Sequence, residues 1–197
     1  MARPQRLPRE ELRQAILDAA QDILRDEGVD ALTARAIAKR VGYTAASIYN
    51  VFESMSDLLI EVNRRTLTDL RLIFVDLPES APPDVRLKEL LRRYIAFMQR
   101  NPALWAALFG GTRKRESFPD WYTASVRFLL GQLRDMLREV TGETDDARAW
   151  AQAEQLYLAV HGAISLDLGR RLDLVTPQPL NHVTEAILDM MLARFRT

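Results

Sequence analysis

The stretch from Leu32 to Phe52 constrains the fold more than any other part of the chain, because it predicts two short helices joined by a tight turn. Thr33 is a suitable N-cap for the first helix, and Gly42 suits the left-handed conformation with which many helices end. Thr44 is a suitable cap for the second helix, in which Ile48 falls on the inward face at helical spacing. The sequence therefore predicts a helix-turn-helix unit.

The same stretch has an unusual charge distribution. It contains no Asp or Glu, but it carries Arg35, Lys39 and Arg40 together with several hydroxyl side chains. Cations and hydroxyls are the groups that contact DNA phosphates, and a helix of this size fits the major groove. Helix, glycine and helix alone are also typical of an ordinary helical hairpin, so the charge distribution is what favours DNA binding. The candidate DNA-contacting residues are Thr33, Arg35, Lys39, Tyr43, Thr44, Ala45, Ala46, Ser47, Tyr49 and Asn50.

The N-terminal part of the chain resembles the TetR/AcrR-type bacterial transcriptional repressors. The residues that carry the resemblance are Ile16, Leu17, Ala19, Ala20, Glu27, Gly28, Leu32, Thr33, Arg35, Ile37, Ala38, Gly42, Ser47, Tyr49, Phe52 and Leu58. Two positions depart from the family pattern: Val51 stands where a His is usual, and Met55 stands where a Lys is usual. These departures imply the loss of two expected phosphate contacts.

The resemblance implies a two-part organisation, and the sequence fits it. We expect a helix-turn-helix DNA-binding domain over residues 1–55 and a helical domain that binds a ligand and forms a dimer over residues 56–197.

Met1 to Arg9 carries three Arg and two Pro residues, which favours a flexible basic arm. The segment from Pro78 to Asp84, PESAPPD, is the clearest break in the chain. Amphipathic helical patterns precede and follow it, and together they predict about nine helices and no convincing strand. The fold class is therefore all-α.

Composition narrows the function classes. The formal net charge is +0, so any nucleic-acid binding must come from a local concentration of cations. The chain has no Cys and two His residues, which excludes disulfides and makes a metal site improbable. We find no motif for a phosphate-binding loop, a nucleophile elbow or a zinc hydrolase, so we expect no enzyme activity, cofactor or metal. Neither a signal peptide nor a transmembrane stretch is evident, which predicts a cytoplasmic protein without a membrane partner.

The aromatic residues beyond the Pro-rich break suggest a place for a small molecule. Aromatic side chains at helical spacing usually form a core, and a ligand cavity between helices is the alternative. The family resemblance favours the cavity. The candidate ligand-binding residues are Trp105, Phe109, Trp121, Tyr122, Phe128, Trp150, Tyr157 and His161.

The penultimate helix has two apolar faces, and two faces imply two packing partners. The resemblance implies a homodimer through the last two helices. The candidate dimer residues are Ala149, Ala153, Leu156, Val160, Ala163, Ile187 and Met190.

Together with these patterns, the family resemblance implies a homodimeric, ligand-responsive repressor that a small-molecule effector releases from a palindromic operator in double-stranded DNA. The alternative is a helical enzyme or small-molecule carrier that has an aromatic cavity and a purely structural helix-turn-helix.

Overall fold

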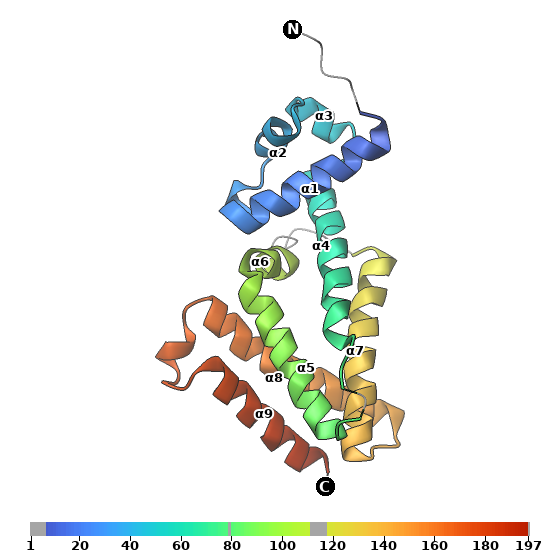
Figure 1. Ribbon diagram of the computed structural model, residues 1–197, viewed down its shortest axis with the longest axis vertical. Helices are drawn as coiled ribbons and strands as arrows, with labels where there is room; N and C mark the ends of the chain where they lie inside the picture. The colour runs from blue at the N-terminus through green and yellow to red at the C-terminus, as the bar shows by residue number, and fades with distance from the viewer. Residues whose placement is uncertain (1–6, 79, 111–117, 197) are drawn as a thin grey trace. The chain divides into compact units, whose positions relative to one another are not determined.

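The computed structural model describes residues 7–78, 80–110 and 118–196. Within this part, the chain forms nine α-helices, three short 3-10 helices and no strand, which confirms the all-α prediction (Figure 1). The helices are α1 (Arg9–Glu27), α2 (Ala34–Val41), α3 (Ala45–Tyr49), α4 (Met55–Arg71), α5 (Pro83–Arg100), α6 (Pro102–Gly110), α7 (Asp120–Thr141), α8 (Asp146–Leu168) and α9 (Leu180–Phe195). The 3-10 helices are η1 (Val29–Ala31), η2 (Leu72–Phe74) and η3 (Leu172–Leu174).

The chain forms two compact units. The first unit contains the residues up to Thr68 together with α6, and the second unit contains residues from Asp69 to Arg100 and from Phe118 onwards. The sequence division after residue 55 separates the helix-turn-helix from the rest. The structural division instead follows packing, and it leaves most of α4 with the first unit.

The first unit has one continuous apolar core. Helices α1, α2, α3 and α4 contribute the fully buried side chains of Ile16, Ile37, Ile48 and Leu58, and α6 adds Leu104. A helix as short as α3 is marginal by itself, so it depends on this packing for its stability. The core therefore holds α3 in a fixed orientation on α1, α2 and α4.

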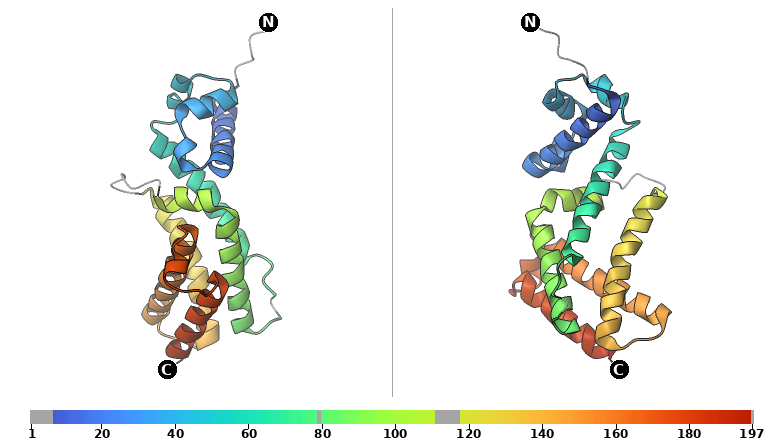
Figure 2. Two further views of the ribbon diagram at one scale, coloured as in Figure 1. Left: turned by 90° about the vertical axis from the view of Figure 1, so that its left-hand side faces the viewer. Right: turned by 45° about the vertical axis from the view of Figure 1, so that its right-hand side comes forward.

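The second unit is built around α8, against which α7 and α9 both pack. Figure 2 shows α8 and α9 side by side. Its core includes Leu87 and Met98 of α5, Leu137 of α7, Ile164 of α8 and Leu188 of α9, all nearly inaccessible to solvent. Apolar residues from α5, α7 and α9 thus pack with those of the long central helix α8.

Candidate nucleic-acid interface and regulatory cluster

Local capping interactions delimit the two short helices as the sequence predicts. The Thr33 hydroxyl accepts the backbone N–H of Ala36 at 3.1 Å, and the Thr44 hydroxyl accepts that of Ser47 at 3.3 Å. Gly42 has φ 73°, a left-handed conformation that costs a residue with a Cβ atom more than it costs glycine. The helix-turn-helix prediction is therefore confirmed down to its caps.

Helix α3 buries Ile48, which is 1% exposed, and turns a narrow strip outward. Thr44, Ala46, Tyr49 and Asn50 are exposed. Among the other candidates near this helix, Tyr43, Ala45 and Ser47 are half-buried, and the hydroxyls of Ser47 and Thr44 lie 2.9 Å apart in a hydrogen bond. The exposed strip is thus narrower than the sequence suggested, while the DNA-contacting role of all these residues stays a prediction.

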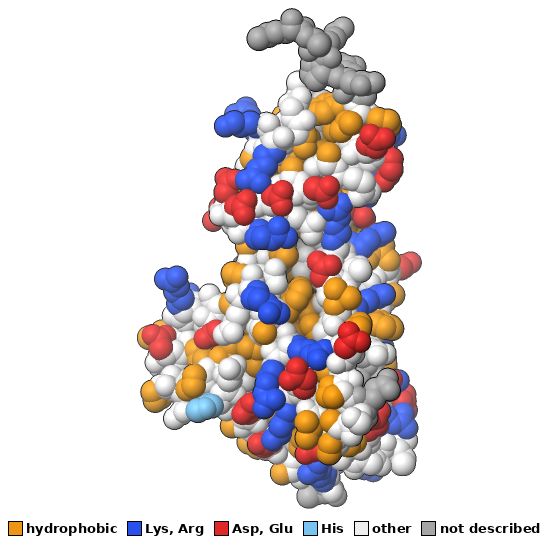
Figure 3. Space-filling model, viewed as in Figure 1, with side chains coloured by type: hydrophobic (Ala, Val, Ile, Leu, Met, Phe, Trp, Pro, Cys, Tyr) orange, Lys and Arg blue, Asp and Glu red, His pale blue; other side chains and the backbone are white. Residues whose placement is uncertain are grey.

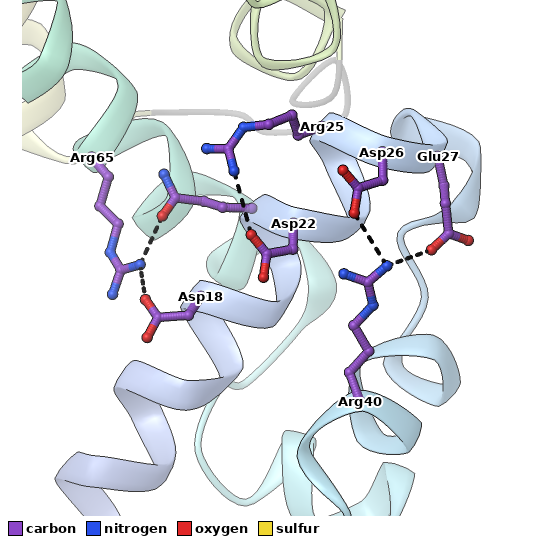
Figure 4. A network of polar contacts seen from close by, with 8 residues as sticks. Asp18, Asp22, Arg25, Asp26, Glu27, Arg40 and Arg65 are labelled. Atoms are coloured by element: carbon purple, nitrogen blue, oxygen red, sulfur yellow. Dashed lines mark hydrogen bonds and ion pairs between the residues drawn. The ribbon is translucent and has the colours of Figure 1, made fainter.

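Among the described residues of the first unit, most cations form ion pairs with the unit's own carboxylates, as Figure 4 shows for the acidic side of α1. Arg65 Nη1 lies 2.5 Å from Asp18 Oδ1, and both of its terminal nitrogens also donate to Gln side chains of α1. Arg40 Nη2 lies 2.8 Å from Glu27 Oε1 and 3.5 Å from Asp26 Oδ2. Arg40 is therefore committed to α1, although it belongs to the acid-free stretch of the sequence.

Further pairs occupy Arg13 and Arg64, which share Glu61 of α4, and Arg25, which pairs with Asp22 on its own helix. On the face seen in Figure 3, acidic and basic side chains alternate over α1 instead of forming one basic field. An interface for a polyanion must therefore lie where cations are left unpaired.

Three cations in the described part of the first unit have no carboxylate within ion-pair distance: Arg9, Arg35 and Lys39. Arg35 and Lys39 are four residues apart on α2, so they lie on the same side of that helix, and both are exposed. The sequence analysis named both as phosphate-contacting candidates. It placed Arg9 at the end of a flexible arm, whereas Arg9 is the first residue of α1; residues 1–6 of that arm lie outside the described part.

The two departures from the family pattern both pack inward. Val51 and Met55 are half-buried against the apolar core of the first unit, and Met55 is the first residue of α4. The Ser54 hydroxyl accepts the N–H of Asp57 at 3.1 Å and donates to its carboxylate at 2.7 Å, so this pair caps the start of α4.

The candidate ligand residues fall in both compact units. Trp105 and Phe109 lie on α6 in the first unit with ring centroids 4.4 Å apart, whereas the other six lie in the second unit. Trp150 is covered by two guanidinium groups of α7, with Arg127 Cζ 3.8 Å and Arg134 Cζ 4.6 Å from its ring centroid. Phe128 is 46% exposed and lies 4.5 Å below the guanidinium of Arg71. Trp150 and Phe128 therefore form cation–π contacts, which the sequence pattern did not indicate.

A polar aromatic cluster is formed by α5, α7 and α8 of the second unit: Tyr122 of α7 is buried, and Tyr94 of α5 and Tyr157 and His161 of α8 are half-buried. The Tyr94 hydroxyl lies 3.3 Å from Nδ1 of His161, and the ring centroids of Tyr157 and His161 are 5.1 Å apart. Trp121 adjoins the cluster through Tyr122, with ring centroids 5.5 Å apart. The sequence analysis missed Tyr94 as a candidate, although its place on the apolar side of α5 could have indicated it.

Burial sets the protonation of this cluster. Desolvation lowers the pKa of His161 to about 4, so its imidazole is neutral near pH 7. Desolvation, with a smaller effect of Tyr157, raises the pKa of Tyr122 to about 12, and burial also raises the pKa of Tyr94 and of Tyr157. The cluster therefore presents uncharged hydroxyl and imidazole groups, which can donate and accept hydrogen bonds.

The dimer role of the candidate residues on α8 and α9 stays a prediction, and their burial divides them into two groups. Ala149, Ala153, Leu156, Val160 and Ala163 are at most 7% exposed within the single chain, where α7 and α9 cover α8. A partner chain cannot reach side chains that the chain's own core encloses. On α9, Ile187 is half-buried and Met190 is 67% exposed, so only these two candidates remain accessible.

Two sequence profiles match the chain. Residues 16–62 match the profile described as bacterial regulatory proteins, tetR family, and residues 87–191 match a tetracyclin repressor-like C-terminal domain. The second match alone covers more than half of the 197 residues. The chain belongs to the TetR family.

Relatives support this membership. The HTH-type transcriptional regulator Rv0681 of Mycobacterium tuberculosis is 27% identical over 169 residues, which are 85% of this chain and 73% of the relative. The nucleoid occlusion factor SlmA of Marinobacter nauticus is 31% identical over 132 residues, which are 64% of this chain and 67% of the relative. A solved structure of a Rhodococcus sp. RHA1 protein of unknown function shares the fold, with TM-score 0.77, 20% identity and full coverage of both chains.

Family membership decides between the two interpretations of the sequence. The chain is a TetR-type transcriptional regulator with a DNA-binding domain, and it is not an enzyme. Among the described residues, no group of His, Asp or Glu side chains could hold a metal ion. None of the helices described here is both long and apolar enough to span a bilayer.

Proposed function

We propose that this TetR-type regulator is a homodimeric repressor that binds a palindromic operator and is released from it by a small molecule. The observation that carries the proposal is the distribution of ion pairs in the first unit. Among its described residues, carboxylates pair with most of the cations, whereas Arg35 and Lys39 remain unpaired and exposed on α2, the helix that packs against α3. Unpaired cations beside a short exposed helix suit a protein that contacts phosphates while α3 enters the major groove. Such a regulator acts where the chromosome lies, in the cytoplasm.

The proposed dimer uses the outward sides of α8 and α9. Leu158 and Leu166 are 66% and 37% exposed, and they lie on one side of α8 with Gly162 midway between them. A Cβ atom at Gly162 would meet nothing within 4 Å, so this position leaves room for a second helix. Met190 extends the apolar surface on α9. Exposed apolar side chains in such a row favour a symmetric partner, and a two-fold dimer would present two copies of α3 to two half-sites.

The proposed effector site is the polar aromatic cluster of Tyr94, Tyr122, Tyr157 and His161. Its groups are uncharged near neutral pH, so it suits an aromatic or apolar molecule with uncharged hydrogen-bonding groups. The effector must bind one conformation of the dimer more tightly than the other to change its affinity for DNA. For the effector to release the dimer from the operator, the conformation that binds the effector more tightly must bind the operator less tightly.

Selection of bound duplexes from a random pool, followed by affinity measurement, tests the DNA-binding part of this proposal. We expect a selected site with two-fold symmetry, and weaker binding of all duplexes by the variant Arg35→Gln/Lys39→Gln, because phosphate contacts carry no sequence information. The variant Arg64→Gln is the matched control, since Arg64 is already paired with Glu61. Equal affinities of both variants and the unaltered protein would refute the proposed interface.

A further inference from the structure

The segment just before α1 forms a hydrogen bond with the residue just before the N-cap of α3. The backbone N–H of Leu7 donates a hydrogen bond of 2.7 Å to the hydroxyl of Tyr43. Tyr43 packs against the core of the first unit, and it directly precedes Thr44, the N-cap of α3. The residues that open α1 therefore lie beside the turn between α2 and α3.

Arg9 follows Leu7 by two residues. Consecutive Cα atoms are about 3.8 Å apart, so the Cα atom of Arg9 lies within about 7.6 Å of that of Leu7. Arg9 is exposed and has no carboxylate within ion-pair distance. Arg13, one turn further along α1, differs in both respects: it pairs with Glu61 at 3.0 Å and lies over the ring of Phe52. Among the cations of α1, the one nearest in sequence to the Tyr43 contact is thus the one without a carboxylate partner.

We propose that Arg9 is a third phosphate-contacting cation beside Arg35 and Lys39, and that Tyr43 positions it. This inference rests on the proposed function, in which the side of the first unit that carries α3 meets DNA. Tyr43 fixes the start of α1 through the Leu7 N–H, and Arg9 extends from the first turn of that helix. Because a hydroxyl that accepts a hydrogen bond keeps its own proton, Tyr43 can also donate to a phosphate oxygen.

This arrangement gives Tyr43 a role other than sequence recognition. A side chain that orients a phosphate contact changes the affinity for every duplex, whereas a side chain on a base edge changes the preference among duplexes. The sequence analysis grouped Tyr43 with the α3 residues. The structure instead assigns its hydroxyl to the start of α1.

The first test compares Arg9→Gln with Arg25→Gln in the full-length protein. Both changes remove one positive charge from α1, but Arg25 is already paired with Asp22. We expect Arg9→Gln to weaken binding to the selected operator and to an unrelated duplex by a similar factor. Each phosphate contact contributes ~0.9 to the slope of log affinity against log salt, so a dimer should lose about two units of slope. Equal behaviour of the two variants would overturn the assignment of Arg9.

The second test is a double-mutant cycle of Tyr43→Phe and Arg9→Gln. Phe keeps the ring that packs against the core and removes the acceptor for the Leu7 N–H. If Tyr43 positions Arg9, the double variant should lose less binding free energy than the sum of the losses in the two single variants. Thermal unfolding of Tyr43→Phe shows whether its fold is intact. Strict additivity would overturn the positioning role.

The variant Arg35→Gln/Lys39→Gln separates this inference from the proposed function. If it weakens binding and Arg9→Gln does not, the inference fails while the interface stands. If neither variant weakens binding, the proposed interface itself fails.

Discussion

The two units differ in the charge and the burial of the side chains proposed for their tasks. The first unit leaves Arg35 and Lys39 unpaired on its surface, while its carboxylates hold the cations that surround them. The second unit encloses a neutral cluster around Tyr94 and His161, in which burial keeps the groups uncharged. DNA binding needs charge in contact with solvent, whereas selective binding of a small uncharged molecule needs polar groups shielded from it. Changes to buried residues of the second unit should therefore affect stability first, and changes to the exposed cations of the first unit should affect affinity for DNA.

The largest expected effect separates the buried and outward sides of α8. Ala153 is 0% exposed, so Ala153→Glu would place a carboxylate in the core and should cost several kcal/mol of unfolding free energy. Leu158 is 66% exposed, and Leu158→Glu should leave the fold intact but weaken the proposed dimer. Thermal unfolding and sedimentation at matched concentrations distinguish the two outcomes. A folded Ala153→Glu monomer would restore the original assignment of the buried face to the dimer.

The alanines of α8 show where prediction from sequence reached its limit. Caps depend on neighbours in the chain, so Thr33, Gly42 and Thr44 could be predicted and are confirmed. An apolar helical face shows only that something covers it. Whether α9 or a second chain covers Ala153 depends on tertiary packing, which periodicity does not contain.

The candidate sites divide in the same way. Arg35 and Arg40 lie in the same acid-free stretch, but only Arg40 forms ion pairs. Its carboxylate partners lie on α1, outside that stretch. Likewise, Trp150 and Tyr157 share a helical spacing, but the guanidinium groups of α7 cover the first. In both places, the partner comes from another helix, and no local pattern identifies it.

A smaller effect should appear in the pH dependence of stability. His161 has a pKa of about 4 when folded and about 6.5 when unfolded, so below pH 6.5 the unfolded chain takes up a proton before the folded chain does. Stability from this group is complete above pH 6.5 and is lost as the pH falls towards 4. The other titratable groups of the cluster, Tyr94, Tyr122 and Tyr157, stay protonated throughout this range because burial raises the pKa of each.

Between pH 7 and pH 5, His161 should account for about 1 kcal/mol of lost stability, after allowance for solvent screening of a half-buried ring. The variant His161→Asn should lose less stability over the same interval. His182 is exposed on α9, so His182→Asn is the matched control, because it removes an imidazole outside the cluster. Identical pH profiles for all three proteins would show that the imidazole of His161 is solvated and that the cluster is not shielded.

The smallest effect concerns Arg40, whose guanidinium is paired with two carboxylates of α1. Glu27→Gln removes the nearer of its two carboxylate partners, at 2.8 Å, and should let Arg40 turn towards a phosphate. An exposed ion pair contributes about 0–1 kcal/mol, so we expect affinity for all duplexes to rise only a few-fold, with a steeper dependence on salt.

The control for a general charge effect is Asp22→Asn, which removes an equal charge from α1 but frees only Arg25 of the same helix. Arg40→Gln alone should change DNA affinity little, because its guanidinium is occupied by Asp26 and Glu27. In the double variant Glu27→Gln/Arg40→Gln, the gain in affinity should therefore disappear. If the gain persists, it comes from reduced repulsion of phosphates by Glu27, and Arg40 serves only to join α1 to α2. If Arg40→Gln alone weakens binding as much as Arg35→Gln does, its pairing with α1 does not restrain it, and ion pairing then fails to distinguish the cations that meet DNA from those that hold the fold.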